Sequence, residues 1–248
     1  MKIGVIGTGN IGGTLARKLS EAGHQVKVAN SRGVEAVRTI AQEINAEPTD
    51  IYGAVAGVDA VILSIPLPAL SSLPKDLFKE LPSNVPVIDT SNYYPGLRDP
   101  QITALDEGQA ESEWVQEQIA HPVVKAFNNI LADSLAEMGL PQESRGRLAV
   151  AVAGDHPEVV QTAIALVNDI GFDPVFSGTI AESWRQQPCT PSYCCDWDAA
   201  TMLRALDLAK RGDGLARLPS LYASFAKLGE NPSHADIIEN NRSINWPV

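Results

Sequence analysis

Residues 2–12 read KIGVIGTGNIG, a short apolar strand followed at once by glycines in the spacing G-x-G-x-x-G. The residues after the loop place apolar side chains at helical spacing, and Gly23 is a typical residue to end that helix. A strand that passes through such a loop into a helix is the beginning of a βαβ unit that binds a dinucleotide. Gly7 permits the tight turn, Gly9 lets the backbone approach the pyrophosphate, and Gly12 lets the helix pack closely on the strand.

The rest of the loop, Thr8, Asn10 and Ile11, leads into the first turn of this helix. The first N–H groups of a helix have no partner within it, and the helix dipole places positive charge there, so this end attracts phosphate. We therefore expect the loop to hold the pyrophosphate of a dinucleotide. The alternative is a glycine-rich turn with a purely structural role, which the strand and helix on either side make the weaker interpretation.

The end of the second expected strand distinguishes NAD from NADP. NAD-binding proteins usually place Asp or Glu there to hold the ribose 2′-hydroxyl, whereas this chain has Asn30, Ser31, Arg32 and Gly33. Ser31 can donate to a 2′-phosphate, and Arg32 can pair with it and stack on adenine. Thr8 is close enough in this fold to add a hydroxyl. The pattern favours NADP(H), with a solvated loop arginine as the alternative.

Apolar strands alternate with helical patterns through the first two thirds of the chain. This alternation predicts a doubly wound, mainly parallel α/β Rossmann sheet with helices on both faces and right-handed crossovers throughout. Asp155 is expected to cap the helix that starts beside it. We expect further strands at residues 25–29, 60–64, 85–89, 123–127, 148–153 and 173–176, and helices at 33–45, 49–56, 73–81, 113–120, 131–138 and 155–170.

The pattern changes after Thr179. Pro188, Pro191 and Pro219 interrupt a segment with a Trp- and Cys-containing loop and an expected helix at residues 197–210. We predict an NADP-binding Rossmann domain at residues 1–180. A small, mainly helical region at 181–248 would cap the site or form a dimer contact.

Several strand ends carry residues that could orient a nicotinamide or a substrate, because ligands of such sheets bind at the carboxyl ends of the strands. Ile65 and Pro66 could form an apolar floor under the ring. The asparagines could equally stabilise local turns through their own backbone. The candidate residues at these ends are Ser64, Ile65, Pro66, Asn92, Ala126, Asn128 and Asn129.

The C-terminal region supplies fewer clear candidates. Its aromatic and amide residues could cover the nicotinamide or simply pack on the sheet edge. Catalytic residues stay unassigned. No Ser-x-x-x-Lys motif stands in the region expected for short-chain dehydrogenases, no Cys/His set suggests a catalytic zinc, and no obvious His–Asp pair follows the sheet. The histidines are expected to be solvated. The residues concerned are Trp184, Arg185, Gln186, Gln187, Tyr193 and Trp197, and the histidines are His24, His121, His156 and His234.

Composition narrows the class of partner. The 248 residues carry a formal net charge of −11, which argues against nucleic acid or an anionic membrane as the main partner. The N-terminus lacks the pattern of a signal peptide, so we expect a cytoplasmic protein. Cys189, Cys194 and Cys195 fit free thiols better than a disulfide framework or a metal site.

Four segments together resemble the coenzyme F420-dependent NADP oxidoreductase family, whose relatives include the NADPH-binding domain of STEAP-type metalloreductases. They are residues 3–12, Asn30-Ser31-Arg32, Ser64-Ile65-Pro66 and residues 124–128. The resemblance covers about residues 1–180. It implies hydride transfer between NADP(H) and a flavin-like ring such as F420, usually in a homodimer. By position, Thr8, Ser31 and Arg32 would hold the 2′-phosphate, and Ile65, Pro66 and residues 127–132 would line the nicotinamide site.

Two other functions stay open. Pyrroline-5-carboxylate reductases share this N-terminal style, so an imine or carbonyl reductase is one alternative, although the tail after residue 181 is too short and proline-broken for their usual helix bundle. A non-catalytic NADPH-sensing module is the other, because no catalytic side chain can be assigned.

Overall fold

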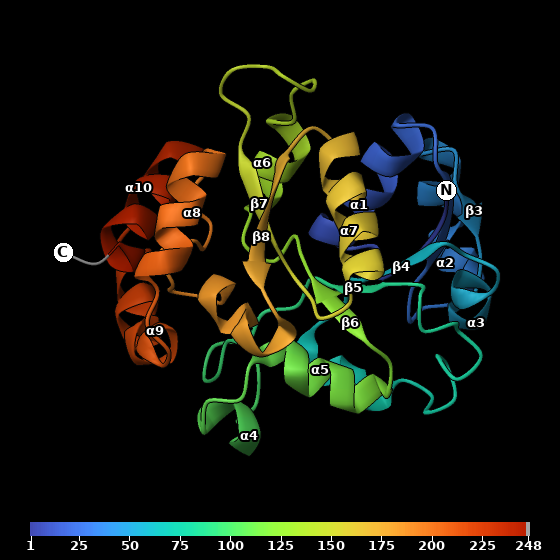
Figure 1. Ribbon diagram of the computed structural model, residues 1–248, viewed down its shortest axis with the longest axis horizontal. Coiled ribbons are helices and arrows are strands. Elements are labelled where there is room, and N and C mark those ends of the chain that lie inside the picture. The colour runs from blue at the N-terminus through green and yellow to red at the C-terminus, as the bar shows by residue number, and fades with distance from the viewer. Residues whose placement is uncertain (247–248) are drawn as a thin grey trace.

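The computed structural model describes residues 1–246, and its centre is one eight-stranded sheet (Figure 1). The strands lie in the order β3-β2-β1-β4-β5-β6-β7-β8. Strands β1 to β6 run parallel, which confirms the expected doubly wound α/β class. The strands are β1 (Lys2–Ile6), β2 (Gln25–Ala29), β3 (Glu47–Pro48), β4 (Ala60–Leu63), β5 (Val87–Asp89), β6 (Val123–Lys125), β7 (Ala149–Ala153) and β8 (Asp173–Gly178).

Helices cover both faces of the sheet, and within residues 1–246 one 3-10 helix and three α-helices follow its last strand. One face carries α1, α2 and α7, and the other carries α3, the 3-10 helix η1 and α5. The helices are α1 (Asn10–Glu21), α2 (Val34–Glu43), α3 (Ile51–Val55), η1 (Leu67–Ser72), α4 (Thr103–Asp106), α5 (Glu111–Ile119), α6 (Ala132–Glu137), α7 (Pro157–Asp169), η2 (Ile180–Gln186), α8 (Ala199–Leu208), α9 (Asp213–Phe225) and α10 (His234–Asn245).

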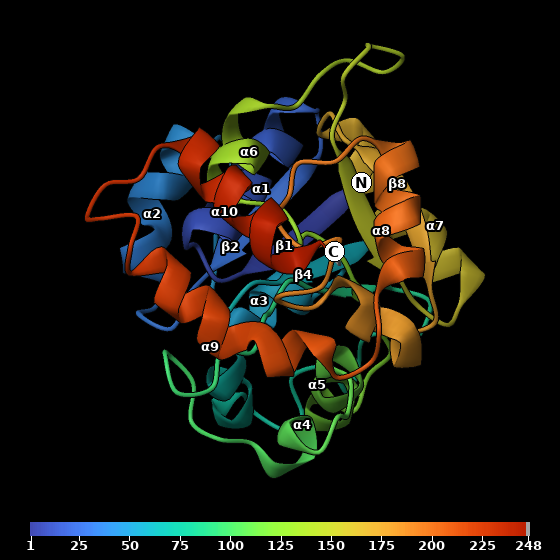
Figure 2. The same cartoon turned by 90° about the vertical axis from the view of Figure 1, so that its left-hand side faces the viewer.

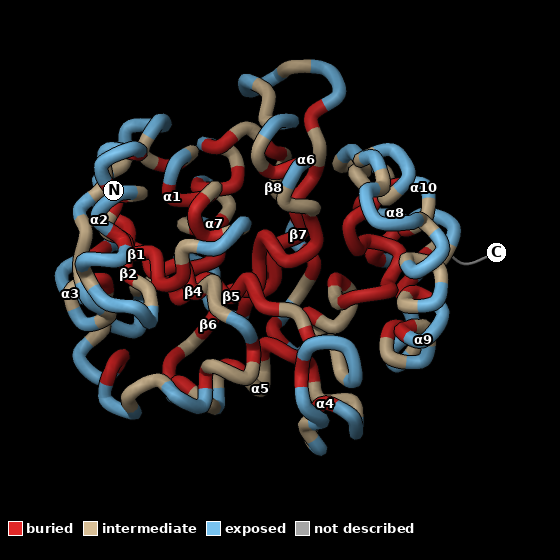
Figure 3. The backbone as a smooth tube through the Cα atoms, turned by 180° about the vertical axis from the view of Figure 1, so that it is seen from behind, coloured by how far each residue is buried: buried red, intermediate tan, exposed pale blue. Residues whose placement is uncertain are grey.

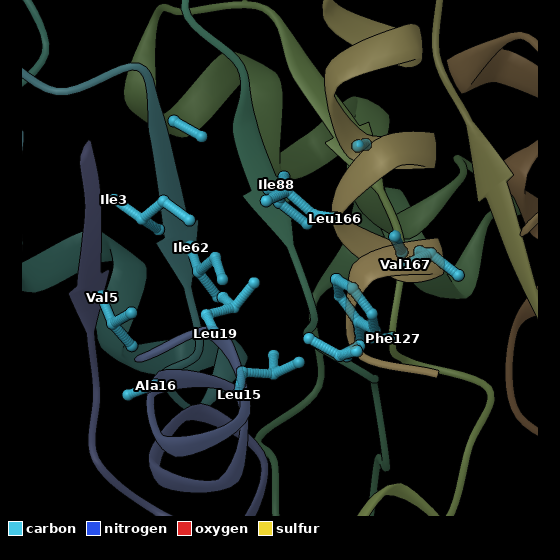
Figure 4. Close-up of a cluster of buried hydrophobic side chains, with 14 of the residues drawn as sticks. Ile3, Val5, Leu15, Ala16, Leu19, Ile62, Ile88, Phe127, Leu166 and Val167 are labelled. Atoms are coloured by element: carbon cyan, nitrogen blue, oxygen red, sulfur yellow. The ribbon is translucent and has the colours of Figure 1, made fainter. Parts of the chain in front are cut away.

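Alternation along the buried strands divides the core in two. In β4, Ile62 joins the cluster under α1 and α7, while Val61 and Leu63 join the cluster under α3 and α5. Figure 4 shows the first cluster, where Leu15 and Leu19 of α1 lie beside the strand side chains. Because successive strand residues point to opposite faces, a strand covered on both sides must be apolar throughout. Figure 3 shows the result, a sheet buried along its length under partly exposed helices.

The sheet, which was expected to be mainly parallel, has one antiparallel pairing, at β7. Strand β7 meets β6 antiparallel through a single pair, Lys125 and Ala153, and β8 is parallel to β7. The prediction of right-handed crossovers throughout is therefore wrong at this connection. Helix α6 has only six residues, about 9 Å of rise, and does not act as a full crossover helix between parallel neighbours.

The helix expected at residues 73–81 is absent; this segment forms consecutive turns, and the nearest helix is the 3-10 helix η1. Its backbone bonds are isolated i→i+3 bonds such as Leu77 N–H to the Pro74 carbonyl. Pro74 and Pro82 bound a segment too short to offset the cost of starting an α-helix. The strand β3 and the helix α4 were not expected, because both are too short to leave a periodic pattern.

Two predictions about individual residues also fail. His156 occupies the N-cap position of α7 without a side-chain bond to the first turn, and Asp155 instead accepts a hydrogen bond from Ile180 N–H, at 2.9 Å. Asp155 thus joins the start of α7 to the start of η2. Pro219 does not interrupt the C-terminal region but lies inside α9.

The C-terminal helices lie together at one end of the molecule (Figures 1 and 2). Helix α8 packs on β7 and β8 through Met202 and Leu206. Helix α9 packs against the loop after β5, where Tyr222 donates to the carbonyl of Pro95, and α10 packs on α9. Within residues 1–246, none of the helices combines the length and apolar character needed to cross a membrane.

Candidate functional site

Two of the loop glycines are required by the protein's own packing. Gly7 has φ +102°, and a Cβ there would lie 2.1 Å from the carbonyl oxygen of Ser64. A Cβ on Gly12 would lie 2.0 Å from the carbonyl oxygen of Gly7. Any larger residue at either position would push the loop away from the ends of β1 and β4.

Gly9 is different, because a Cβ there would meet no protein atom within 4 Å, and its φ of −78° suits any residue. It is the N-cap of α1 and offers no side-chain bond to the first turn. The N–H groups of that turn are therefore open to an external acceptor. The space beside Gly9 is a cradle that a side chain would fill, which fits the close approach of a pyrophosphate.

The loop after β2 is tied to the glycine loop by Asn30. Its Nδ2 donates to Thr8 Oγ1 at 3.1 Å, and its Oδ1 accepts from Arg32 N–H at 2.9 Å. Ser31 and Arg32 are exposed, and among residues 1–246 no carboxylate lines the cavity beside them. Because Thr8 accepts from Asn30, its own hydroxyl proton remains available to a phosphate oxygen.

A cavity of about 610 Å³ lies among these loops, and we call it the glycine-loop cavity. Most of the sequence-based candidates from the N-terminal half line it. Sequence reasoning missed one wall, supplied by the start of α3 and by η1 with the turn after it, because neither segment carries a recognisable motif. Its lining residues are Ile6, Gly7, Thr8, Gly9, Asn30, Ser31, Arg32, Ile51, Ser64, Ile65, Pro66, Ala69, Ser72, Leu73 and Pro74.

The remaining candidates do not line this cavity. Asn10 and Gly33 are exposed and Ile11 is half-buried, all at the starts of α1 and α2, whereas Gly12 is buried beneath the loop. Ala126 is fully buried in the core under α7.

Asn128 is committed to contacts within the protein. It is 2% exposed, and its Nδ2 donates to Asn92 Oδ1 at 3.0 Å and to the Gln186 carbonyl at 2.7 Å. Its Oδ1 accepts from Gln186 Nε2 at 2.9 Å. Gln186 also donates to the Ala151 carbonyl and accepts from Ser177. Asn128 and Gln186 thus join the ends of β6, β7 and β8, where a polar group is buried with its partners satisfied.

A buried triad of charged residues lies close by, at the ends of β5 and β6. Lys125 Nζ is 3.2 Å from Asp89 and 3.1 Å from Glu111, and all three side chains are at most 2% exposed. Asp89 and Lys125 are register partners on β5 and β6, so both side chains point to the face under α5, which brings Glu111. Burial alone would lower the pKa of Lys125, but the two carboxylates outweigh it and raise that pKa.

A second cavity, of about 440 Å³, lies between the loops after β5 and β6 and the C-terminal helices; we call it the tyrosine cavity. Tyr94, Leu131 and Tyr193 contribute walls, and the hydroxyls of the two tyrosines share a hydrogen bond. Burial raises the pKa of both phenols well above the usual value, so both are protonated at neutral pH. Of the C-terminal residues singled out from the sequence, Tyr193 lines this cavity.

The expectation of solvated histidines without an aspartate partner is wrong for three of the four. His234 Nε2 lies 2.8 Å from Asp196, and His24 Nε2 lies 3.2 Å from Asp169. His121 is 5% exposed. Long-range packing brings these pairs together from segments 38 and 145 residues apart, so no local pattern could have shown them.

The three cysteines are free and buried. Burial raises the pKa of the Cys195 thiol to about 12, so it is not a reactive thiolate at neutral pH. Cys194 differs from the other two because it lines the tyrosine cavity.

Comparison with known proteins identifies the family. The model of the family described as NADP oxidoreductase, coenzyme F420-dependent, matches residues 2–93. Protein YjhV of Escherichia coli (strain K12) is 81% identical over 109 residues, which are 44% of this chain and 80% of that protein. The chain belongs to this family. It is therefore one of the NAD(P)-dependent oxidoreductases, as the glycine loop and the acid-free strand end indicated.

Solved structures agree with the fold. Protein SMa0349 of Sinorhizobium meliloti superposes with a TM-score of 0.62 at 27% identity, covering 74% of this chain and 87% of that one. A candidate F420-dependent NADP reductase from Arthrobacter sp. FB24 also reaches 0.62, at 20% identity over 92% of this chain and 95% of that one. The second likeness extends the shared fold over most of the chain.

Proposed function

We propose that this protein is an NADPH-dependent oxidoreductase that transfers hydride between NADP(H) and a flavin-like ring, such as F420, or another small acceptor. One observation carries the proposal: a single cavity joins the glycine loop to a strand end that bears Ser31 and Arg32 in place of a carboxylate. A carboxylate there would repel a 2′-phosphate, whereas a hydroxyl and a guanidinium attract it.

In this proposal each part of the glycine-loop cavity has a role. The backbone at Gly9 and the start of α1 hold the pyrophosphate, and Thr8, Ser31 and Arg32 hold the 2′-phosphate. Ile65 and Pro66 lie on the same wall after β4 and would support the nicotinamide. The nicotinamide, when bound, supplies the hydride. The protein contributes alignment and the exclusion of water, so no acid–base dyad is needed for that step.

Cofactor selectivity gives the first test. Arg32→Ala should weaken NADPH binding by about 1–3 kcal/mol and leave NADH binding nearly unchanged, because only NADPH carries the phosphate that pairs with the guanidinium. Arg38→Ala is the matched control, since Arg38 pairs with Glu35 on α2 and does not line the cavity. Isothermal titration calorimetry measures both nucleotides. Equal losses for NADPH and NADH in Arg32→Ala would contradict the proposal.

The acceptor is a separate question. Stopped-flow absorbance with F420, flavins, quinones and ferric chelates should show NADPH oxidation with at least one of them. Oxidation with cyclic imines alone would favour the imine reductase. Tight NADPH binding with no oxidation by any acceptor would favour the sensing module.

A further inference from the structure

The tyrosine cavity is a second ligand-sized space at the carboxyl edge of the sheet. Its walls include Tyr94 and Leu97 from the loop after β5, Leu131 after β6, and Leu221 and Phe225 of α9. The glycine-loop cavity lies at the ends of β1, β2 and β4, and β5 and β6 come next in the sheet. The two cavities therefore follow one another along the edge where ligands of such sheets bind.

The chemistry of its walls is distinctive. Among the described residues that line it, none is Asp, Glu, Lys, Arg or His. The guanidinium beside it, that of Arg98, stacks 5.1 Å from the centre of the Tyr94 ring and is paired with Asp99 at 2.8 Å. Asn241 is 2% exposed, and its Nδ2 donates to the Cys194 carbonyl. A charged ligand would find no unpaired opposite charge here and would lose its hydration.

The two phenols are the polar feature of this wall. In a hydrogen bond between two hydroxyls, one proton lies between the oxygens, and the other can donate to a third group. Here that group is either the sulfur of Cys194, which lies within hydrogen-bond reach of Tyr193, or a bound ligand. Tyr193 is 6% exposed, so the packing around it limits the movement of its hydroxyl. A buried pair with one spare proton is suited to a ligand that presents a single acceptor oxygen on an apolar body.

We propose that the tyrosine cavity binds the oxidoreductase's acceptor, and that this acceptor is a neutral ring compound whose carbonyl oxygen takes a hydrogen bond from the Tyr94–Tyr193 hydroxyl pair. The inference rests on the proposed function and, of the two acceptor classes named there, takes the other small acceptor, a neutral carbonyl compound, rather than a flavin-like ring. Reduction of a carbonyl adds a hydride to carbon and a proton to oxygen. The hydride comes from NADPH, which is oxidised to NADP⁺, and a tyrosine hydroxyl gives the proton and regains one from water. The phenols can serve as proton donors because the alkoxide formed from the carbonyl is a stronger base than a phenolate.

Binding can be tested without NADPH by using fluorescent probes. The neutral probe is 2-acetylnaphthalene, a planar ketone, and the charged probe is 6-acetyl-2-naphthoate, which adds one carboxylate to the same ring. A fluorescence titration of the wild-type protein should show saturable binding of the ketone and at least tenfold weaker binding of the naphthoate. Naphthoate binding that equals or exceeds ketone binding would overturn the claim of a neutral acceptor. No saturable binding of the ketone would overturn the site.

Hydroxyl deletions test the role of the pair. Tyr94→Phe and Tyr193→Phe should each weaken ketone binding about tenfold, the loss typical of one good hydrogen bond. Tyr222→Phe is the matched control, because Tyr222 lines the same cavity while its hydroxyl donates to the Pro95 carbonyl. It should bind the ketone within about twofold of wild type. Equal affinities in all three variants would overturn the role of the pair.

A further variant keeps the test valid if a buried tyrosine is needed for folding. Ala226 is an exposed residue on the rim of the cavity, so Ala226→Trp should block the ketone without disturbing the core. Unchanged ketone affinity in Ala226→Trp would contradict the site. NADPH affinity is measured in the same samples and should be unaltered in every variant. The protein could bind the ketone through the tyrosines and yet fail to bind NADPH. That result would contradict the proposed function but would still support the tyrosine cavity as a ligand site.

Discussion

Asn30 follows β2 and Asn128 follows β6, so both stand at the carboxyl edge of the sheet, yet their surroundings differ. Asn30 is half-buried, links two loops and lines an open cavity. Asn128 is buried and holds Asn92 and Gln186 with every polar atom of its side chain. A polar residue at a strand end is thus a binding candidate only where the protein leaves its neighbourhood open.

The same contrast separates the glycine loop from the buried polar groups at the end of β6. Around β1, β2 and β4, glycines and short polar loops surround free space. Around β6, a buried lysine, two carboxylates and two amides satisfy one another. We therefore expect substitutions near β6 to lower stability, and substitutions around the glycine loop to lower nucleotide affinity.

The largest effect should come from Lys125→Met. It leaves two carboxylates buried together without their cation, which should cost about 3–5 kcal/mol of unfolding free energy. The deficit should shrink as the pH falls, because burial already raises the pKa of Glu111, and protonation removes its charge once the cation is gone. Lys27→Met is the control, since Lys27 Nζ donates to the backbone carbonyls of Gly53 and Ala56 rather than to a carboxylate. Urea denaturation measures the unfolding free energy of both variants. Equal losses of unfolding free energy in Lys125→Met and Lys27→Met would contradict the special role of the buried triad.

Two glycines of the loop should respond differently to the same substitution. Gly12→Ala should destabilise the fold by about 1–3 kcal/mol, because its Cβ meets the Gly7 carbonyl. Gly9→Ala should leave stability unchanged or raise it by about 0.4–1 kcal/mol, since its Cβ enters open space. Gly9→Ala should instead weaken NADPH at least tenfold. Thermal melting measures the stability of each variant, and calorimetry measures its affinity for NADPH. If Gly9→Ala bound NADPH as tightly as the wild type, a pyrophosphate beside Gly9 would be contradicted.

The smallest expected effect distinguishes the two asparagines themselves. Asn128→Ala should lower stability by about 1–2 kcal/mol, because Gln186 Nε2 loses a buried acceptor. Asn30→Ala should change stability by no more than about 0.5 kcal/mol, as expected for a partly exposed loop residue. It should weaken NADPH several-fold by releasing the Arg32 loop. Urea denaturation measures both variants. A larger loss of stability in Asn30→Ala than in Asn128→Ala would contradict the assignment of Asn30 to binding and Asn128 to stability.

The sequence by itself determined the fold class, the position of the glycine loop and the absence of an acid after β2. These features are local: each depends on the order of a few neighbouring residues and on the period of buried strands and helices. The domain boundary near residue 180 stays a prediction, although the chain after it forms the helices η2, α8, α9 and α10. The turns at residues 73–81 were predicted wrongly because apolar spacing cannot show that two prolines leave too little room for a helix.

Only the tertiary structure decided which polar residues face a ligand and which serve the core. Asn128 pairs with a residue 58 positions away, and Tyr94 with one 99 positions away. No local period carries such information, because these contacts depend on how α9, α10 and the loop at residues 189–196 fold back on the sheet. The antiparallel entry of β7 is of the same kind, since strand direction is set by the path of the connection rather than by the residues of the strand.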